Sequence, residues 1–358
     1  MKKSKTDGKS SRWKRTALII LCVILALVLL ATVAVYWYVD RLLGKIQYVD
    51  PSEATLSTEE AVILQTEDLE TMDPTEDLPL LDPITIPTEE TAAPTEPAPT
   101  EPMGDIVNIL LIGQDRREGE GRSRSDSTIL VTFNKTTGTI SLTSFMRDAY
   151  VQIPGYSNFK LNHAFQCGGM SLLNETLAVN YGVPVDGDVV VDFFQFKKLI
   201  DLLGGVEVTL TQKEADSINA GSPWNLKAGR QILDGPKALK YSRIRYLDSD
   251  YRRAERQRTV LLALVDKIKG LSVIEMMPIL EEVMGMVSTN MSKDQIISLA
   301  VELFPMLTSA KFEQHQIPTP GTFKGGNVQV RPGLKGWFQY DIDFEANRKL
   351  LREIFDAD

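Results

Sequence analysis

The chain has 358 residues, with 39 Lys and Arg against 48 Asp and Glu, which gives a formal net charge of −9. Two cysteines cannot build a disulfide framework and no Cys or His spacing suits zinc, so a disulfide-stapled fold and a zinc or redox site are excluded. The charge is unevenly placed: residues 1–49 are basic, residues 50–103 carry fifteen acids and no base, and the rest is nearly neutral. This division predicts segments with different physical roles.

The first segment is predicted to be a membrane anchor. Residues 16–39 carry no charge, and at about 1.5 Å per residue a helix of this length spans roughly 36 Å, enough to cross a bilayer. Residues 1–15 hold seven Lys and Arg, which predicts a cytoplasmic basic tail and an extracellular remainder. A cleaved signal peptide is the alternative, although its apolar core would be shorter. A location outside the cell membrane argues against a nucleic-acid partner.

Residues 40–103 are predicted to be an extracellular linker. Pro-Thr-Glu recurs in this segment, beginning at Pro74, Pro87, Pro94 and Pro99. Like charges and prolines prevent a packed core, so we expect a disordered spacer with local polyproline character.

Residues 104–358 are predicted to form one α/β domain. In chain order, we expect strands at 107–113, 128–133 and 139–144, a helix at 170–181, a strand at 188–192, a helix at 196–203 and a strand at 205–210. Helices are expected to follow at 235–240, 251–269, 274–287 and 293–303. Strands interleaved with helices favour a three-layer α/β/α sandwich around a mixed central sheet.

Two acids stand next to predicted strands. Asp115 follows the first strand, and Asp126 comes just before the second. Carboxylates at neighbouring strand ends can converge on a hard cation such as Mg²⁺. Solvated loop acids are the alternative for this pair taken alone.

Arginines accompany these acids. The loop between the first two strands contains Arg116, Arg117, Arg122 and Arg124, and Arg147 follows the third strand. Arg243 and Arg245 alternate, so an extended backbone would put both on one face. In the helix at 251–269, Arg253 and Gln257 continue the apolar stripe, so we expect them to point inward. Nearby acids look too few to pair with these arginines, which favours a bound polyanion.

The acids and arginines together indicate a metal-assisted phosphoryl-transfer site. Carboxylates in an anion site are electrostatically unfavourable unless a cation bridges them to phosphate. Arginines and Mg²⁺ would then neutralise the charge that develops on the phosphoryl group. No Walker-type loop is present, so a nucleoside triphosphate is not the expected donor.

Several motifs also resemble a known family. They are NILLIGQDRR, RSDSTI, SFMRDAYVQIPG, KLNHAF, LIDLLGGVEV, LDGPKALKYSRIR and DSDYRRAERQRTVLLAL, in this order. This set is similar to the LytR–CpsA–Psr cell-envelope proteins, some of which carry the older label of transcriptional attenuator. The resemblance implies an α/β/α fold with a lipid tunnel. It also implies Mg²⁺-dependent transfer of an anionic glycopolymer, such as teichoic acid or capsule, from undecaprenyl pyrophosphate to peptidoglycan.

The resemblance assigns roles to individual residues. It makes Asp115 and Asp126 the metal ligands. The residues that it implies for pyrophosphate binding are Arg124, Arg147, Lys160, Arg243, Arg245, Arg253 and Gln257. Phe145-Met146 departs from the family pattern, in which Pro commonly precedes the arginine. His163 is expected to be a packed histidine with no catalytic role.

The functional prediction is a glycopolymer phosphotransferase in which Asp115, Asp126 and Arg147 are catalytic. Asp126 or Asp148 would accept the proton of the attacking hydroxyl, and Asp148 is equally expected to pair with an arginine. Two alternatives stay open: a polyprenyl-pyrophosphate phosphatase that uses water as acceptor, and a non-catalytic lipid-phosphate-binding envelope regulator. The acid pair argues against the regulator, but nothing in the sequence separates the first two.

Overall fold

The structure is a computed structural model that describes residues 36–50, 55–72, 76–84, 104–116, 121–245, 247 and 249–355. The chain divides into two compact units, Met1–Ile46 and Gln47–Asp358. In the first unit residues 36–43 are helical, while the basic tail and residues 16–35 of the expected membrane span lie outside the described residues. Among the helices that are described, none is both long enough and apolar enough to cross a bilayer.

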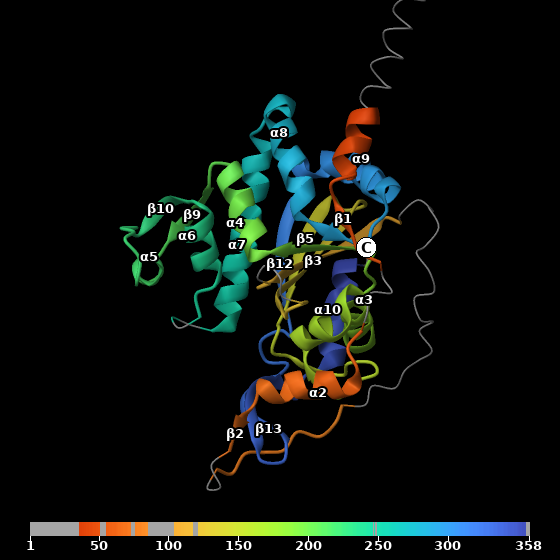
Figure 1. The fold of residues 1–358 in the computed structure, drawn as a ribbon, viewed down its shortest axis with the longest axis vertical. Coiled ribbons are helices and arrows are strands. Elements are labelled where there is room, and N and C mark those ends of the chain that lie inside the picture. The colour runs from red at the N-terminus through yellow and green to blue at the C-terminus, as the bar shows by residue number, and fades with distance from the viewer. Residues whose placement is uncertain are drawn as a thin grey trace, which may run out of the picture. The chain divides into compact units, whose positions relative to one another are not determined.

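The second unit is built around a seven-stranded mixed sheet (Figure 1). Its centre is an antiparallel meander of β3 (Ile106–Gln114), β4 (Ser125–Asn134) and β5 (Thr139–Phe145). Parallel strands flank the meander, β8 (Gly187–Asp192) beside β3 and β12 (Lys311–Ile317) beside β5. Beyond β8 lie β11 (Ser288–Thr289) and β1 (Gln47–Tyr48). The order is therefore β1–β11–β8–β3–β4–β5–β12.

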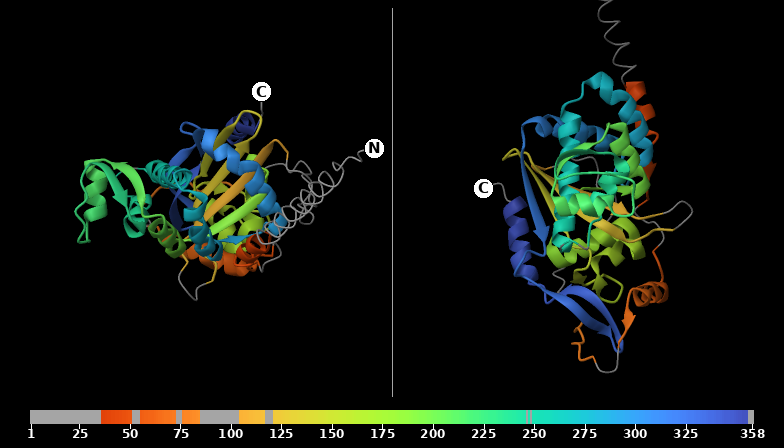
Figure 2. Two further views of the ribbon diagram at one scale, coloured as in Figure 1. Left: turned by 90° about the horizontal axis from the view of Figure 1, so that it is seen from above. Right: turned by 90° about the vertical axis from the view of Figure 1, so that its left-hand side faces the viewer.

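Helices cover both faces of this sheet. Leu110 and Leu130 point to one face, where they join a core with α3 (Leu161–Tyr181) and α10 (Phe344–Phe355). Leu111 and Val131, one residue further along each strand, pack on the other face. That face is covered by α7 (Asp250–Lys269) and α9 (Lys293–Ser309) (Figure 2). The expected α/β fold with a mixed central sheet is confirmed.

A smaller core lies beside α7. It consists of α4 (Phe193–Leu202), β9 (Val206–Leu210), α5 (Gln212–Asn219), β10 (Gly229–Leu233) and α6 (Gly235–Ser242). These elements pack on α7 through Val260 and Leu264. Gly235 lets α6 begin against α4, because a Cβ there would overlap the backbone carbonyl of Lys197. The remaining elements are β6 (Tyr150–Val151), β7 (Phe159–Lys160), α8 (Val273–Val283) and the 3₁₀ helix η1 (Met284–Met286).

Part of the expected linker is folded. Residues 58–67 form α2 (Thr58–Glu67), which begins with a capping box between Ser57 and Glu60 and buries Ala61 in the main core. After it, β2 (Glu70–Thr71) pairs with β14 (Leu334–Tyr340), which also pairs with β13 (Lys324–Arg331). The prediction of a disordered spacer over 40–103 is therefore wrong for these residues. Apart from Glu76, its Pro-Thr-Glu repeats lie outside the described residues.

Asp188 is a fully buried carboxyl in β8. The amide nitrogens of Asn174 and Asn290 donate to its Oδ2 at 2.8 and 2.5 Å. Its Oδ1 and Asn174 Oδ1 are buried without a hydrogen-bond partner in the described part of the chain. Burial raises the pKa of Asp188 to about 6. The stability that the protonated Asp188 carboxyl contributes is therefore fully present below about pH 4 and is lost as the pH rises through 6.

We predict that Asp188→Asn raises the free energy of unfolding at pH 7.5 by about 1–3 kcal/mol, because it removes the cost of ionising a buried carboxyl. The new amide can also donate to Asn174 Oδ1. Urea unfolding at pH 7.5 and 4.5 measures the effect, and the gain should shrink at the lower pH. A variant that is less stable than the wild type at both pH values would contradict the interpretation.

Candidate functional site

The predicted acid pair lies at one edge of the sheet. Gln114 pairs with Ser125 and Gly113 with Ser127, so Asp126 lies in a β-bulge at the start of β4, at the end of the sheet where Asp115 directly follows β3. The segment after α6 meets both acids. Arg243 Nη2 donates to Asp115 Oδ2 at 3.1 Å, and Arg245 Nη2 lies 3.7 Å from Asp126 Oδ1. Residue 244 between them is buried, but the extended backbone expected here is wrong: Arg243 caps the C-terminus of α6, and the backbone N–H groups of Arg243 and Ile244 donate to the carbonyls of Lys240 and Tyr241 in a turn.

Arg147 joins this edge to the end of β5. Its Nη1 donates to Asp126 Oδ1 at 2.8 Å and its Nε donates to Asp148 Oδ2 at 3.1 Å. Burial alone would lower the pKa of Arg147, but the charges of Asp148 and Asp126 raise it above its ordinary value. The guanidinium therefore stays charged although only 17% of the side chain is exposed. Of the two roles expected for Asp148, proton acceptor or partner of an arginine, this contact matches the second.

Asp68, in the expected linker, reaches the same cluster. It follows α2, and its Oδ1 accepts from Arg124 Nη1 at 2.6 Å while its Oδ2 lies 3.0 Å from Lys160 Nζ. Lys160 Nζ is also 3.4 Å from Asp148 Oδ1. Sequence reasoning missed Asp68 because the acidic composition hid the helix. The capping-box pattern Ser-x-x-Glu at Ser57 was the signal that could have found it.

Charge and burial fix the states of Asp68 and His163. Burial by itself would raise the pKa of Asp68, but His163, Lys160 and Arg124 hold it well below the ordinary value. Burial lowers the pKa of His163, whose Nε2 lies 3.7 Å from Asp68 Oδ2. His163 also packs edge-on against the ring of Phe159. The expectation of a packed, neutral histidine fits these contacts.

Arg253 is the most deeply buried cation of the cluster. Its Nη1 lies 2.9 Å from Asp250 Oδ1, but in an orientation that makes no hydrogen bond. Its Nε and Nη1 are thus buried without an acceptor among the residues that the structure describes. Burial and the neighbouring charges of Arg147 and Arg245 lower the pKa of Arg253 to about 10. These N–H groups can therefore still donate hydrogen bonds to a bound anion. Gln257, which is half-buried, lies one turn further along α7.

The carboxyl groups of Asp148 and Asp250 act on each other's pKa, and Arg253 acts on both. Burial raises the pKa of Asp250, and the proximity of Asp148 adds to this rise. Asp148 behaves in the opposite way: burial would raise its pKa, but Arg147 and Lys160 lower it. Asp250 is therefore the member of the pair that holds a proton more readily, and Asp148 is the charged one.

The expectation that acids near the arginines are too few is wrong. We call the six cations of the site the arginine cluster: Arg124, Arg147, Lys160, Arg243, Arg245 and Arg253. Five carboxylates lie among them, namely Asp68, Asp115, Asp126, Asp148 and Asp250. Sequence reasoning could not see these contacts because most partners are far apart in the chain. A nearly balanced cluster would bind a multivalent anion best together with a divalent cation.

The acid pair fits a metal ion that is shared with a substrate. No group of three or more His, Cys, Asp or Glu side chains that could hold a metal occurs among the residues described. Mg²⁺, however, is commonly held by one or two carboxylates together with water and substrate phosphates. Asp115 and Asp126 provide hard oxygen ligands beside cations that suit phosphate. The donor set therefore suits a substrate-bridged Mg²⁺ and does not suit an all-protein cage.

An α/β fold with this cluster defines a protein suited to binding phosphorylated substrates. The chain belongs to the LytR_cpsA_psr family, whose model matches residues 86–335. It is 37% identical over 218 residues to the polyisoprenyl-teichoic acid–peptidoglycan teichoic acid transferase TagT of Bacillus subtilis, covering 59% of this chain and 67% of TagT. It is 28% identical to the regulatory protein MsrR of Staphylococcus aureus, covering 70% of this chain and 75% of MsrR.

Solved structures of relatives share the fold. TagT bound to LIIa-WTA matches with a TM-score of 0.58 and 32% identity, covering 72% of this chain and 93% of that chain. A LytR-CPS2A-psr family protein, YwtF (TagT), with bound octaprenyl pyrophosphate lipid matches with a TM-score of 0.54 and 31% identity, covering 72% of this chain and 92% of that chain.

Burial predicts different stability effects for two arginines of the cluster. Arg147→Ala would leave Asp126 and Asp148 without their main cation, so we expect a loss of about 3 kcal/mol in the free energy of unfolding. The side chain of Arg245 is 42% exposed, so Arg245→Ala should change stability by no more than about 0.5 kcal/mol. Chemical denaturation of both variants measures this difference. Equal losses would show that the charge network differs from the one described.

Proposed function

We propose that this protein transfers an anionic glycopolymer from an undecaprenyl-pyrophosphate carrier to peptidoglycan, with Mg²⁺ as cofactor. The observation that carries the proposal is Arg253, a buried cation with unfilled hydrogen-bond donors inside the arginine cluster. Membership of a family whose relatives include a teichoic acid transferase supports the reaction type. The structure of a relative with octaprenyl pyrophosphate supports the carrier class.

Under this proposal, the residues of the site have different roles. Arg253, Lys160 and Arg124 would bind pyrophosphate oxygens, and Arg243, Arg245 and Gln257 would complete the contacts. Asp115 and Asp126 would hold Mg²⁺, which when bound supplies positive charge against the phosphate oxygens. Positive charge is the main requirement, because polyprenyl phosphate is already a good leaving group.

Asp126 is favoured over Asp148 as the group that accepts the proton of the acceptor hydroxyl. The side chain of Asp126 is 20% exposed, whereas that of Asp148 is 8% exposed. Arg147, Lys160 and Asp250 already engage Asp148. Arg147 would orient Asp126 through the contact to Oδ1 and would stabilise charge at the reacting phosphoryl group.

A non-catalytic envelope regulator is the second candidate, favoured by similarity to a protein named as regulatory. A phosphatase that uses water would share the same site. The purified second unit, incubated with Mg²⁺, a lipid-linked glycan and peptidoglycan fragments, separates the three functions by product mass. Transfer gives glycan joined to peptidoglycan, the phosphatase gives free glycan phosphate, and a regulator gives no product.

We also propose that residues 16–39 cross the cell membrane and place the second unit outside. The support is the uncharged run after seven basic residues. Protease added outside intact cells should release the second unit. Protection of that unit would contradict this topology.

The metal role predicts how two isosteric variants behave. Asp115→Asn and Asp126→Asn should each lower transfer at least about 100-fold, because each removes a charged ligand from the reacting phosphate site. Mg²⁺ with the lipid donor should raise the melting temperature of the wild type and raise it much less in either variant. Asp105→Asn, at an exposed position just before β3, is the matched control and should behave as the wild type. Full turnover in the presence of chelator would contradict the metal role.

A further inference from the structure

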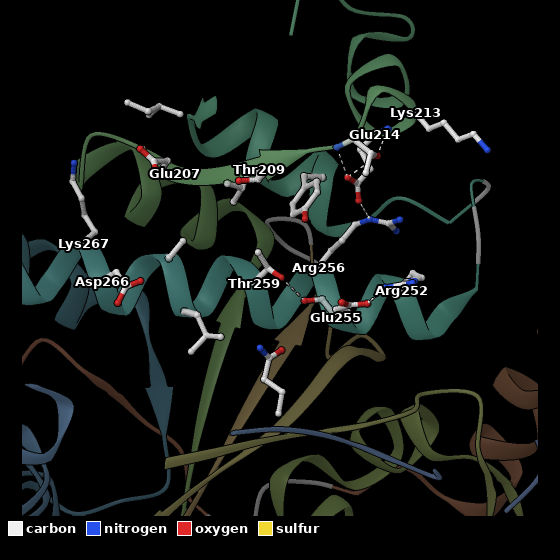
Figure 3. A pocket seen from close by; sticks show the side chains of 18 of the residues that line it. Glu207, Thr209, Lys213, Glu214, Arg252, Glu255, Arg256, Thr259, Asp266 and Lys267 are labelled. Carbon is white, nitrogen blue, oxygen red and sulfur yellow. Dashed lines mark hydrogen bonds and ion pairs between the residues drawn. The ribbon is translucent and has the colours of Figure 1, made fainter. Parts of the chain in front are cut away.

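A polar cleft of about 1120 Å³ opens between β9 and α7 (Figure 3). Thr209 and Glu207 line it from β9, and Thr259 and Asp266 line it from α7. Its volume exceeds that of a typical small-molecule pocket, and its lining combines Lys and Arg donors, carboxylate acceptors, and hydroxyl and amide side chains that both donate and accept hydrogen bonds. None of the roles assigned above to the arginine cluster uses this cleft.

The cleft is electrically balanced, unlike a simple anion site. Four carboxylates and four Lys or Arg side chains line it, so its formal net charge is zero. An anionic polymer would meet as many repelling as attracting charges there. A neutral or zwitterionic saccharide offers hydroxyl and amide groups that both donate and accept, so it would satisfy both kinds of lining side chain.

Buried contacts tie this cleft to the arginine cluster. Arg256 is only 4% exposed; its Nε donates to Glu214 Oε1 at 2.8 Å and its Nη1 donates to the backbone oxygen of Ile244 at 3.2 Å. Ile244 lies between the two arginines that meet the acid pair. Burial raises the pKa of Tyr241 in the cleft wall to about 12, so its hydroxyl keeps its proton at neutral pH. The wall is thus an ordered part of the fold.

The position of α7 relates the two sites. Arg253 belongs to the arginine cluster, whereas Arg252 and Thr259 line the cleft, so one helix serves both. Leu247, just before the helix, also lines the cleft, two residues after Arg245. The cleft therefore extends to the N-terminal end of α7, where the cluster begins. To react with a pyrophosphate held by the cluster, a saccharide in the cleft would have to extend a hydroxyl past this end of α7.

We propose that this cleft binds the acceptor saccharide, a neutral or zwitterionic glycan of the peptidoglycan type. This assignment rests on the proposed transferase function. The same hydroxyl and amide chemistry occurs in the glycan of the lipid-linked donor, but the zero net charge favours the acceptor over a polyanionic donor.

The test fills the cleft without touching the arginine cluster. Thr209→Trp places a large side chain at an exposed position of β9, where aromatic residues are well tolerated. Thr136→Trp, at an exposed position of the β4–β5 turn and not part of the cleft lining, is the matched control. Asp266→Trp fills the cleft from α7 and replaces Thr209→Trp as the test variant if Thr209→Trp does not fold. Purified peptidoglycan oligosaccharides are the acceptor probe, and polyprenyl pyrophosphate with and without its glycan is the donor probe.

We expect Thr209→Trp to raise the KM for the peptidoglycan oligosaccharide about tenfold or more, the effect of losing one or two hydrogen bonds. The dissociation constant for polyprenyl pyrophosphate should be unchanged, and Thr136→Trp should match the wild type. An unchanged acceptor KM with normal transfer would overturn the cleft assignment and leave the proposed function intact. Weaker binding of the glycan-bearing donor alone, with an unchanged acceptor KM, would assign the cleft to the donor and overturn the proposal.

Failure of the proposed function can be told apart from failure of the cleft. If the wild type gives no transfer, binding of the oligosaccharide is measured directly by calorimetry. Binding to the wild type that Thr209→Trp abolishes would support a saccharide cleft in a protein that is not a transferase. No binding to the wild type would overturn the cleft assignment.

Discussion

The contact between Arg147 and Asp126 is the interaction on which the site depends. It joins the end of β5 to the start of β4 and holds a charged guanidinium in a largely buried position. Burying cations is costly unless each has a fixed counter-charge, and this cluster supplies carboxylates from β4, α7 and the segments that follow β5 and α2. The paired central strands fix the spacing of these groups, and a β-bulge in the β3–β4 pairing lies at Asp126 itself.

The same balance explains how the site can hold a highly charged substrate. Among the described residues six cations meet five carboxylates, so strong repulsion within the cluster is avoided. Arg253 nevertheless has two buried donors without an acceptor in that part of the chain. Under the proposed function, a pyrophosphate diester that arrives with Mg²⁺ would bring almost no net charge and would fill such donors. Substrate binding would then satisfy the buried donors that lack an acceptor among the described residues.

Apolar runs in the sequence made the central strands predictable. The partners of the charged side chains could not be predicted in this way. The run at 107–113 became β3, and the runs at 128–133 and 139–144 became parts of β4 and β5 as expected, because strand pattern is local. The helix α2 was missed because acidic residues obscured a capping signal at Ser57. The pairing of Arg243 with Asp115 spans 128 residues, and no local pattern encodes such a contact.

The last elements of the chain were missed for a different reason. The strand β12 alternates only weakly, with three polar residues among its last four, and it gains its place from pairing with β5. The helix α10 has a clear apolar stripe, but it lies beyond the part where the family motifs are dense. Where local strand propensity was weak, pairing with a neighbouring strand thus determined the secondary structure.

Arg253 provides the most direct test of the account. We expect Arg253→Met to raise the dissociation constant for a short-chain polyprenyl pyrophosphate by roughly 10- to 150-fold, the worth of a charge-assisted hydrogen bond. The free energy of unfolding should be unchanged or raised, because the removed donors make no hydrogen bond among the described residues, and Asp250, whose pKa burial already raises, can take up a proton when its cation is removed. Arg258→Met is the control: Arg258 donates to Ser144 and Gln314, so this variant should lose stability and bind normally. If Arg253→Met is destabilised and binds the pyrophosphate as tightly as the wild type, the arginine cluster is structural and the central claim is wrong.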